Sequence, residues 1–154
     1  MVDRDLILAK AGSVKRHLNR IKAKSDSDMA TFMQDLDRQE SVAFNMHLAV
    51  QNCMDIAAHI ISEEGLGVPG SAAEMFYLLQ ENGFLSADLT QKMVKATGFR
   101  NLLVHEYEKI DLQRLYHAAE NNVYDLTEIL AAVFKKLGIA LSLCFVKLAP
   151  GGII

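Results

Sequence analysis

Apolar residues recur at intervals of three and four along most of this 154-residue chain, which is the spacing of amphipathic α-helices. The sequence holds only two prolines, and an alternation with period two never lasts long enough to form a sheet. A chain of this length fits one domain with its own core. These features predict an all-α fold, an antiparallel bundle of about five helices with the two longest at its centre.

Breaks rich in Gly, Pro, Asp and Ser separate the helical stretches, because these residues cap helices or form turns. The expected helices are residues 3–24, a short helix from near Asp28, residues 41–64 after a polar joint at 37–40, short helices opening at Ser71 and Ser86, and a last long helix from Asp111 that closes at Gly138. In this division residues 1–138 form the helical domain. Residues 139–154 are an apolar C-terminal extension that fits no helix cleanly.

Composition and charge restrict the class of protein. A formal net charge of −3 argues against a surface coated in basic charge for non-specific nucleic-acid binding, although a local cationic site stays open. Cys53 and Cys144 lie far apart in apolar surroundings, which is typical of reduced, buried thiols. Charges at residues 3–5 interrupt any signal peptide, and the apolar run 139–146 is far shorter than the ~20 residues of a membrane span. We therefore expect a soluble, cytoplasmic protein with no membrane partner.

The spacing of potential metal ligands matches none of the common helical metal sites. No Glu-x-x-His and no His-Glu-x-x-His sequence occurs, which removes the usual di-iron and zinc-protease signatures. His117-x-x-Glu120 is an isolated pair on a helix flank, and two unclustered cysteines disfavour structural zinc. The sequence predicts neither a metal nor a cofactor.

Side chains able to act on a phosphate ester gather in residues 98–107, at the end of a helical pattern. Arg100 and Asn101 are followed by His105 and Tyr107. An arginine can hold a phosphate with a fork of donors, and a histidine can exchange a proton near neutral pH. A tyrosine hydroxyl can orient a substrate or be modified. The set indicates phosphate-ester chemistry, although no single residue in it is diagnostic.

The expected long central helix also carries polar residues inside an apolar pattern. Gln51, Asp55 and His59 are four residues apart and share one side, with Asn52 beside them. A buried carboxylate is costly unless it is paired, so Asp55 must face solvent, a basic partner or a site. We interpret His59 as structural, whereas Asn52 and Asp55 stay open between structural and site-supporting roles.

Helix geometry limits how the motif residues meet. Positions five apart on a regular helix lie about 140° apart, so Arg100 and His105 do not share a face, whereas Arg100 and Tyr107 do. Either the helix distorts or ends inside the motif, or a second protomer completes the site across a twofold axis; we favour the symmetric dimer. In a purely structural alternative, Arg100 pairs with Asp55 or Glu106, and His105 caps the helix C-terminus.

The stretch Arg100-Asn-Leu-Leu-Val-His105-Glu-Tyr107 matches the Arg-x4-6-His-x-Tyr signature of the HEPN superfamily, and the chain closely resembles the HepT toxin family. Residues 49–63 resemble the long central helix of that family. The loop of residues 65–70, with three glycines and a proline, the Ser71 capping box and residues 94–99 follow in the same order. The likeness covers about residues 3–138, whereas residues 139–154 resemble an addition to the family's core.

The resemblance implies a homodimeric, metal-independent ribonuclease toxin of a prokaryotic toxin–antitoxin pair. Arg100 and His105 would be the catalytic pair acting on RNA, with Asn101 adjoining them. The family's partner is a minimal nucleotidyltransferase (MNT) antitoxin, which transfers AMP from ATP to the motif tyrosine, here Tyr107. From position alone, Lys92 and Lys95 are candidates to help hold RNA.

Two other classes of function remain open from the sequence. One is a non-catalytic helical subunit that presents substrate to a nucleotidyltransferase partner. The other is a helical adaptor whose long apolar stripes recruit other proteins.

Overall fold

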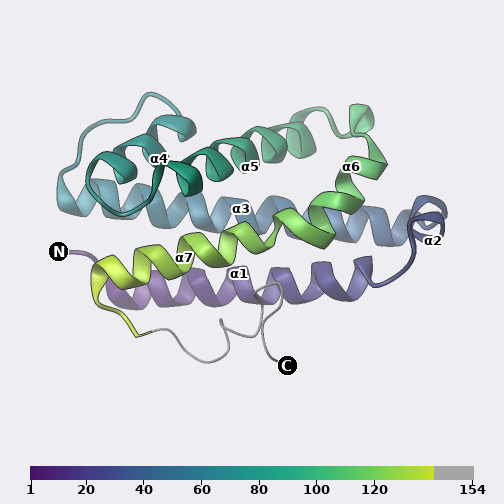
Figure 1. Ribbon diagram of the computed structural model, residues 1–154, viewed down its shortest axis with the longest axis horizontal. Helices are drawn as coiled ribbons and strands as arrows, with labels where there is room; N and C mark the ends of the chain where they lie inside the picture. The colour runs from purple at the N-terminus through teal and green to yellow at the C-terminus, as the bar shows by residue number, and fades with distance from the viewer. Residues whose placement is uncertain (141–154) are drawn as a thin grey trace.

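The computed structural model describes residues 1–140, in which helices joined by loops are the regular structure and no strand occurs (Figure 1). The elements are α1 (Arg4–Ser25), α2 (Met29–Gln34), α3 (Leu36–Glu64), α4 (Ala72–Glu81), α5 (Ala87–His105), the 3-10 turn η1 (Tyr107–Lys109), α6 (Leu112–His117), the π-helical segment η2 (Ala118–Asn122) and α7 (Tyr124–Leu137). The predicted all-α fold is confirmed.

The two longest helices, α1 and α3, pack along each other in opposite directions (Figure 1). At one end, the backbone N–H of Asp3 donates to Nε2 of His59 at 2.9 Å. At the other end, Arg38 donates to the carbonyl oxygen of Lys24 at 3.1 Å. The start of α1 therefore meets the end of α3 and the reverse, so the core is antiparallel as expected. Its two helices are α1 and α3, whereas the two longest expected helices were residues 41–64 and 111–138. His59 has a structural role, as expected from its spacing.

The remaining helices close one continuous core around this pair. α4 and α5 pack on α3 and on each other, and α7 returns against α3 and α5 (Figure 1). Every α-helix contributes apolar side chains to this core, among them Ile7, Phe32, Ile56, Ile60, Phe76, Met93, Leu115, Leu126 and Phe134. Burial of these side chains is the main stabilising term of the fold.

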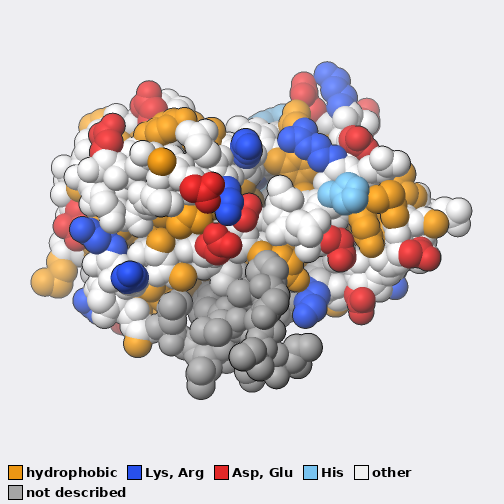
Figure 2. All heavy atoms as spheres, in the orientation of Figure 1, with side chains coloured by type: hydrophobic (Ala, Val, Ile, Leu, Met, Phe, Trp, Pro, Cys, Tyr) orange, Lys and Arg blue, Asp and Glu red, His pale blue; other side chains and the backbone are white. Residues whose placement is uncertain are grey.

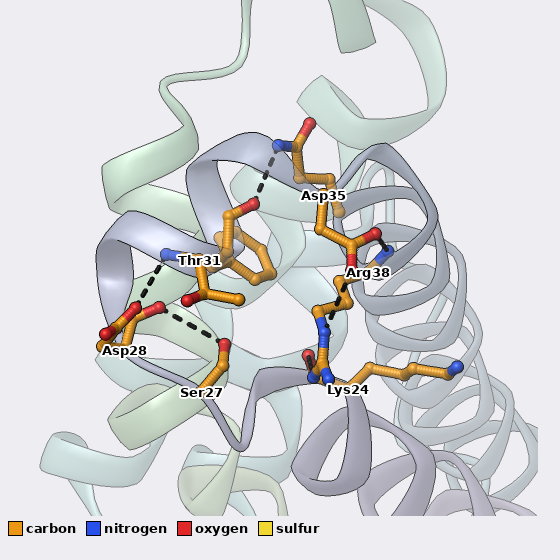
Figure 3. A network of polar contacts seen from close by, with 8 residues as sticks. Lys24, Ser27, Asp28, Thr31, Asp35 and Arg38 are labelled. Carbon is orange, nitrogen blue, oxygen red and sulfur yellow. Dashed lines mark hydrogen bonds and ion pairs between the residues drawn. The ribbon is translucent and has the colours of Figure 1, made fainter.

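Several predicted caps are present. Asp28 accepts a hydrogen bond from the N–H of Thr31 at 2.7 Å and opens α2 (Figure 3). Ser71 and Ser86 accept equivalent bonds, each 3.2 Å long, at the starts of α4 and α5. Gly138 closes α7 with a φ of +69°, a left-handed conformation that glycine adopts at least cost.

The polar joint expected at residues 37–40 is wrong, because α3 begins at Leu36 and runs through it. Asp35 is the reason. Its carboxylate accepts from the N–H of Arg38 at 3.1 Å and pairs with the Nε of the same arginine at 3.1 Å (Figure 3). This cap starts the helix one turn earlier, and the polar residues that follow lie on its surface and at its joint with α2.

The single last helix expected from Asp111 is also wrong. Asp111 caps α6 by accepting from the N–H of Gln113, but the helix widens into η2 before α7 begins. The N–H of Val123 donates to the carbonyl oxygen of Ala118 at 3.0 Å, five residues back. The wider turn changes the phase of the helix and leaves both Ala119 and Val123 buried.

The predictions about the cysteines and about a membrane span can be compared with the structure only within residues 1–140. Cys53 is buried, and burial raises the pKa of its thiol to about 12, with a smaller contribution from Asp55. Cys144 and most of the extension 139–154 lie outside the described residues. Within residues 1–140, no helix is both long and apolar enough to cross a membrane.

The Asp35 cap gives a test of the corrected start of α3. Asp35→Ala removes the N-cap hydrogen bond and the Arg38 pair, so we expect it to lower the free energy of unfolding by about 1 kcal/mol. Asp37→Ala removes the same charge from the same helical turn without a cap bond, and should cost only a few tenths of a kcal/mol. Urea denaturation measures both. Equal losses would contradict the cap.

Candidate functional site

The motif lies at the C-terminal end of α5, which stays helical through His105. The helix ends only after it, where the N–H of Glu106 donates to the carbonyl oxygen of Leu102 at 2.9 Å, and Tyr107 begins η1. Arg100 and His105 therefore both belong to one unbroken helix. On such a helix their side chains leave the axis about 140° apart.

Arg100 is held by a line of polar contacts that crosses three helices. Its Nη2 donates to Oε1 of Gln51 on α3 at 2.6 Å, and its Nη1 donates to Oδ1 of Asn101 at 3.0 Å. The amide of Gln51 donates in turn to Oδ1 of Asp55 at 2.9 Å. Lys10 on α1 pairs with the other oxygen of Asp55 at 3.0 Å. Arg100 thus forms no ion pair with Asp55 or with Glu106 among residues 1–140. The amide of Gln51 lies between Arg100 and Asp55.

This arrangement fixes the guanidinium without cancelling its charge. Both partners of Arg100 are neutral amide oxygens, and the charge of Asp55 is already met by Lys10. The Nε of Arg100 is buried and has no hydrogen-bond partner among residues 1–140. A positioned cation whose charge is not cancelled favours an anion such as a phosphate.

His105 and Tyr107 differ in exposure. The imidazole of His105 is exposed and makes no hydrogen bond with another described residue. Tyr107 is half-buried, and burial raises the pKa of its hydroxyl, with the nearby carboxylate of Glu40 adding to the shift. The tyrosine therefore stays protonated at neutral pH. Its hydroxyl needs a base before it can act as a nucleophile.

His47 is a site residue that the sequence reasoning missed. Burial lowers the pKa of its imidazole, and the positive charge of Arg100 lowers it further. Its Nδ1 is buried and has no hydrogen-bond partner in the described part of the chain. The signal was available, because His47 precedes Gln51 by four residues and so extends the polar side of α3. Gln51 itself was noticed as part of that row but not as the partner of Arg100.

A shallow pocket with a volume of about 330 Å³ lies between α3 and the motif. His47 and Tyr107 line it together with Glu40, Phe44 and Val104. Phe44 is 60% exposed and Val104 is 42% exposed, which is high for apolar side chains. An apolar surface therefore lies next to His47, whose pKa the charge of Arg100 lowers.

The other candidate residues do not hold Arg100. The amide of Asn52 donates to the carbonyl oxygen of Leu48 in its own helix at 2.8 Å, and the hydrogen bonds of Arg100 within residues 1–140 go to Gln51 and Asn101. Lys95 is exposed on another side of α5. No group of three or more His, Cys, Asp and Glu side chains that could hold a metal ion occurs within residues 1–140.

Lys92, the other lysine predicted to help hold RNA, lies among three carboxylates. Its Nζ lies 3.3 Å from Asp88, 3.6 Å from Asp125 and 3.5 Å from Glu128. The hydrogen bond to Asp88 and these charges raise the pKa of the ammonium. Three carboxylates around one ammonium leave an acidic neighbourhood, which repels phosphate.

An all-helical bundle that carries Arg-x4-His-x-Tyr at the end of α5 has the fold and the motif of the HEPN class of proteins. The family model described as "Ribonuclease HepT-like" matches residues 14–133, most of the chain. The chain belongs to this HepT-like ribonuclease family, and it is therefore an endoribonuclease by class.

Relatives and solved structures agree with this assignment. The "mRNA nuclease HepT" of Shewanella oneidensis is 31% identical over 129 residues, which cover 84% of this chain and 96% of that protein. The "tRNA nuclease HepT" of Aphanizomenon flos-aquae is 27% identical, over 68% of this chain and 71% of the relative. A tri-AMPylated HEPN toxin of S. oneidensis, in complex with its MNT antitoxin, superposes with a TM-score of 0.79 and 30% identity, covering 85% of this chain and 98% of that one.

The pKa of His47 gives a test of the polar group around Arg100. Because this pKa is lowered in the folded protein, the unfolded chain binds more protons as the pH falls below about 6.5. The wild-type protein should therefore lose stability between about pH 7 and about pH 5, and His47→Gln should lose less over the same range. Urea denaturation at a series of pH values measures the two slopes. Identical slopes would contradict the location of His47.

Proposed function

We propose that this chain is the ribonuclease toxin of a HEPN/MNT toxin–antitoxin pair, and that it cleaves RNA without a metal ion at a cleft shared by two copies. The observation that carries the proposal is the contact between Arg100 and Gln51, which fixes a guanidinium while leaving its charge free. Membership of the HepT-like ribonuclease family and the names of the relatives support the same function.

Arg100 has the role of holding the phosphate. In RNA cleavage, negative charge builds on the phosphoryl oxygens, and a guanidinium fixed in advance stabilises it without reorganising. Gln51 and Asp55 are positioning residues, since they hold Arg100 and touch no substrate. Asn101 adjoins the cation and orients it from the exposed side.

His105 has the role of moving the proton. The ribose 2′-hydroxyl loses its proton and its oxygen forms a bond to the adjacent phosphorus, while the bond from phosphorus to the 5′-oxygen breaks and that oxygen is protonated. An exposed imidazole can serve one of these two transfers. This chemistry needs a nearby cation and a proton carrier, and Arg100 and His105 are of those types.

In our proposal, a second copy of the chain supplies the histidine that acts with each Arg100. Arg100 and His105 of one chain diverge on an unbroken α5, so one copy alone does not bring them together. The exposed apolar side chains of Phe44 and Val104 line the pocket that His47 and Tyr107 share, and give a surface for the second copy to cover. In a twofold dimer, each arginine can then meet the histidine of the other chain.

Tyr107 is the proposed site of neutralisation by an MNT antitoxin. Its hydroxyl oxygen would attack the α-phosphorus of ATP, releasing pyrophosphate, and the hydroxyl proton would pass to a base that the antitoxin supplies. Tyr107 lines one pocket with His47, whose pKa is lowered by the charge of Arg100 as well as by burial. AMP attached there adds a negative phosphodiester near the cation and occupies the place of the RNA phosphate.

Loss of either motif residue should abolish cleavage. We expect Arg100→Ala and His105→Ala each to lower the rate of RNA cleavage by about a hundredfold or more, because each removes a group required in the transition state. Arg20→Ala on the exposed side of α1 is the control and should cleave like the wild type. The assay uses unmodified protein purified without its antitoxin, with circular dichroism to check the fold.

Two outcomes of that assay would contradict the proposal. Full activity of His105→Ala would remove the catalytic assignment. A folded, unmodified wild-type protein that leaves RNA intact would favour the alternative of a non-catalytic subunit for a nucleotidyltransferase.

Co-expression with an MNT antitoxin tests the modification. We expect the intact mass to rise by whole AMP units that map to Tyr107, and cleavage to fall with the modified fraction. Tyr107→Phe should keep its unmodified mass, whereas Tyr77→Phe, which changes another exposed tyrosine, should still gain AMP. AMP units on Tyr107→Phe in the same number as on the wild type would contradict the assignment.

A further inference from the structure

A groove with a volume of about 460 Å³ lies on another side of α5, between that helix and the α6–η2–α7 segment. Apolar side chains form its floor, including Val50 from α3, Phe99 from α5 and Leu126 from α7. Lys95 and Arg114 stand on its rim. Figure 2 shows a hollow on this face, with hydrophobic side chains between Lys or Arg side chains.

The two ends of the groove differ in charge. Neither Lys95 nor Arg114 has a carboxylate within ion-pair distance among residues 1–140, and the guanidinium of Arg114 lies 4.9 Å from the centre of the Phe99 ring. At the other end, Lys92 is surrounded by three carboxylates, including Asp125, which also lines the groove. One end is therefore cationic and the other acidic.

We propose that this groove binds one nucleotide of the RNA strand that is being cleaved, with the base on the apolar floor and the phosphate held by Lys95 and Arg114. This inference rests on the proposed function. The groove would hold the RNA at a nucleotide that lies outside the bond being cleaved. Bases of single-stranded RNA stack on aromatic rings and on guanidinium planes. Arg114 presents such a plane already backed by Phe99.

The groove and the proposed site are separate surfaces, and α5 contributes residues to both. Phe99 lines the groove and is followed directly by Arg100, which turns toward α3. Lys95 lies about 7.5 Å from Arg100 along the helix axis, given a rise of about 1.5 Å per residue. A few nucleotides of extended RNA cover this distance. One strand can therefore contact both Arg100 and the groove.

The local backbone and the charges favour RNA as the occupant. The π-helical segment η2 lines the groove with Ala118 and Asn122, and π segments of this kind are frequent at functional sites. The cationic rim attracts phosphate, whereas the carboxylates around Lys92 repel it. Lys95 and Arg114 would therefore make the contact with the phosphate. Lys92 instead links α5 to α7 through its ion pairs with Asp125 and Glu128.

The test measures binding in a His105→Ala background, so that cleavage does not intervene. The probe is a labelled single-stranded RNA oligonucleotide, and its affinity is followed by fluorescence anisotropy at several salt concentrations. Changing Lys95 and Arg114 together to Gln should weaken binding about tenfold or more and lower the salt slope by about 0.7, since the contact with one phosphate is lost. Lys95→Glu alone changes an exposed residue, leaves the fold intact and should weaken binding as well.

Arg20→Ala combined with Lys22→Ala is the matched control, because it removes two exposed positive charges from α1. It should change affinity less than twofold. Unchanged affinity of the groove variants would overturn the inference, and so would an equal loss in the control, which would indicate charge alone. Groove variants that bind RNA normally but no longer bind an MNT antitoxin would overturn it in favour of a protein partner.

Failure of the groove and failure of the proposed function are distinguishable. With His105 intact, groove variants should cleave RNA with a raised KM and a nearly unchanged kcat. Wild-type protein that cuts RNA while the groove variants cut it with the same KM overturns the groove alone. Wild-type protein that cuts no RNA overturns the proposed function first.

Discussion

The site depends on one hydrogen bond, from the guanidinium of Arg100 to the amide oxygen of Gln51. A carboxylate in the same position would hold the arginine equally well, but it would also cancel its charge. The protein instead places Asp55 one step further back, where it orients the Gln51 amide and is itself balanced by Lys10. The cation is therefore both fixed and available.

This line of contacts links the site to the core of the bundle. Lys10, Gln51 and Arg100 come from α1, α3 and α5, so the packing of these three helices sets where the guanidinium lies. The same regular helix that holds Arg100 directs His105 elsewhere. The unbroken α5 thus directs Arg100 and His105, the proposed catalytic pair, to two different sides. This geometry is the physical basis for proposing that two copies share the cleft.

Much of the fold was predictable from the sequence, because helices and their caps are encoded locally. Asp28, Ser71, Ser86 and Gly138 cap as expected, and the motif lies at the end of a helix as its pattern indicated. The predicted helix boundaries were wrong at two places, where Asp35 caps α3 and where the π-helical segment follows His117. Neither feature has a strong signal in the sequence pattern. His47 and Gln51 share the polar side of α3 in the sequence, but their approach to Arg100 follows from the packing of α3 against α5.

Mixing two inactive proteins tests the shared cleft most directly. Arg100→Ala and His105→Ala chains, unfolded together, refolded and assayed for RNA cleavage, should form mixed dimers in which one of the two clefts has both groups intact. The account predicts recovery of about one quarter of the wild-type rate, because about half of the dimers are mixed and each has one working cleft. Confirmed mixed dimers that cleave no faster than either parent would contradict it.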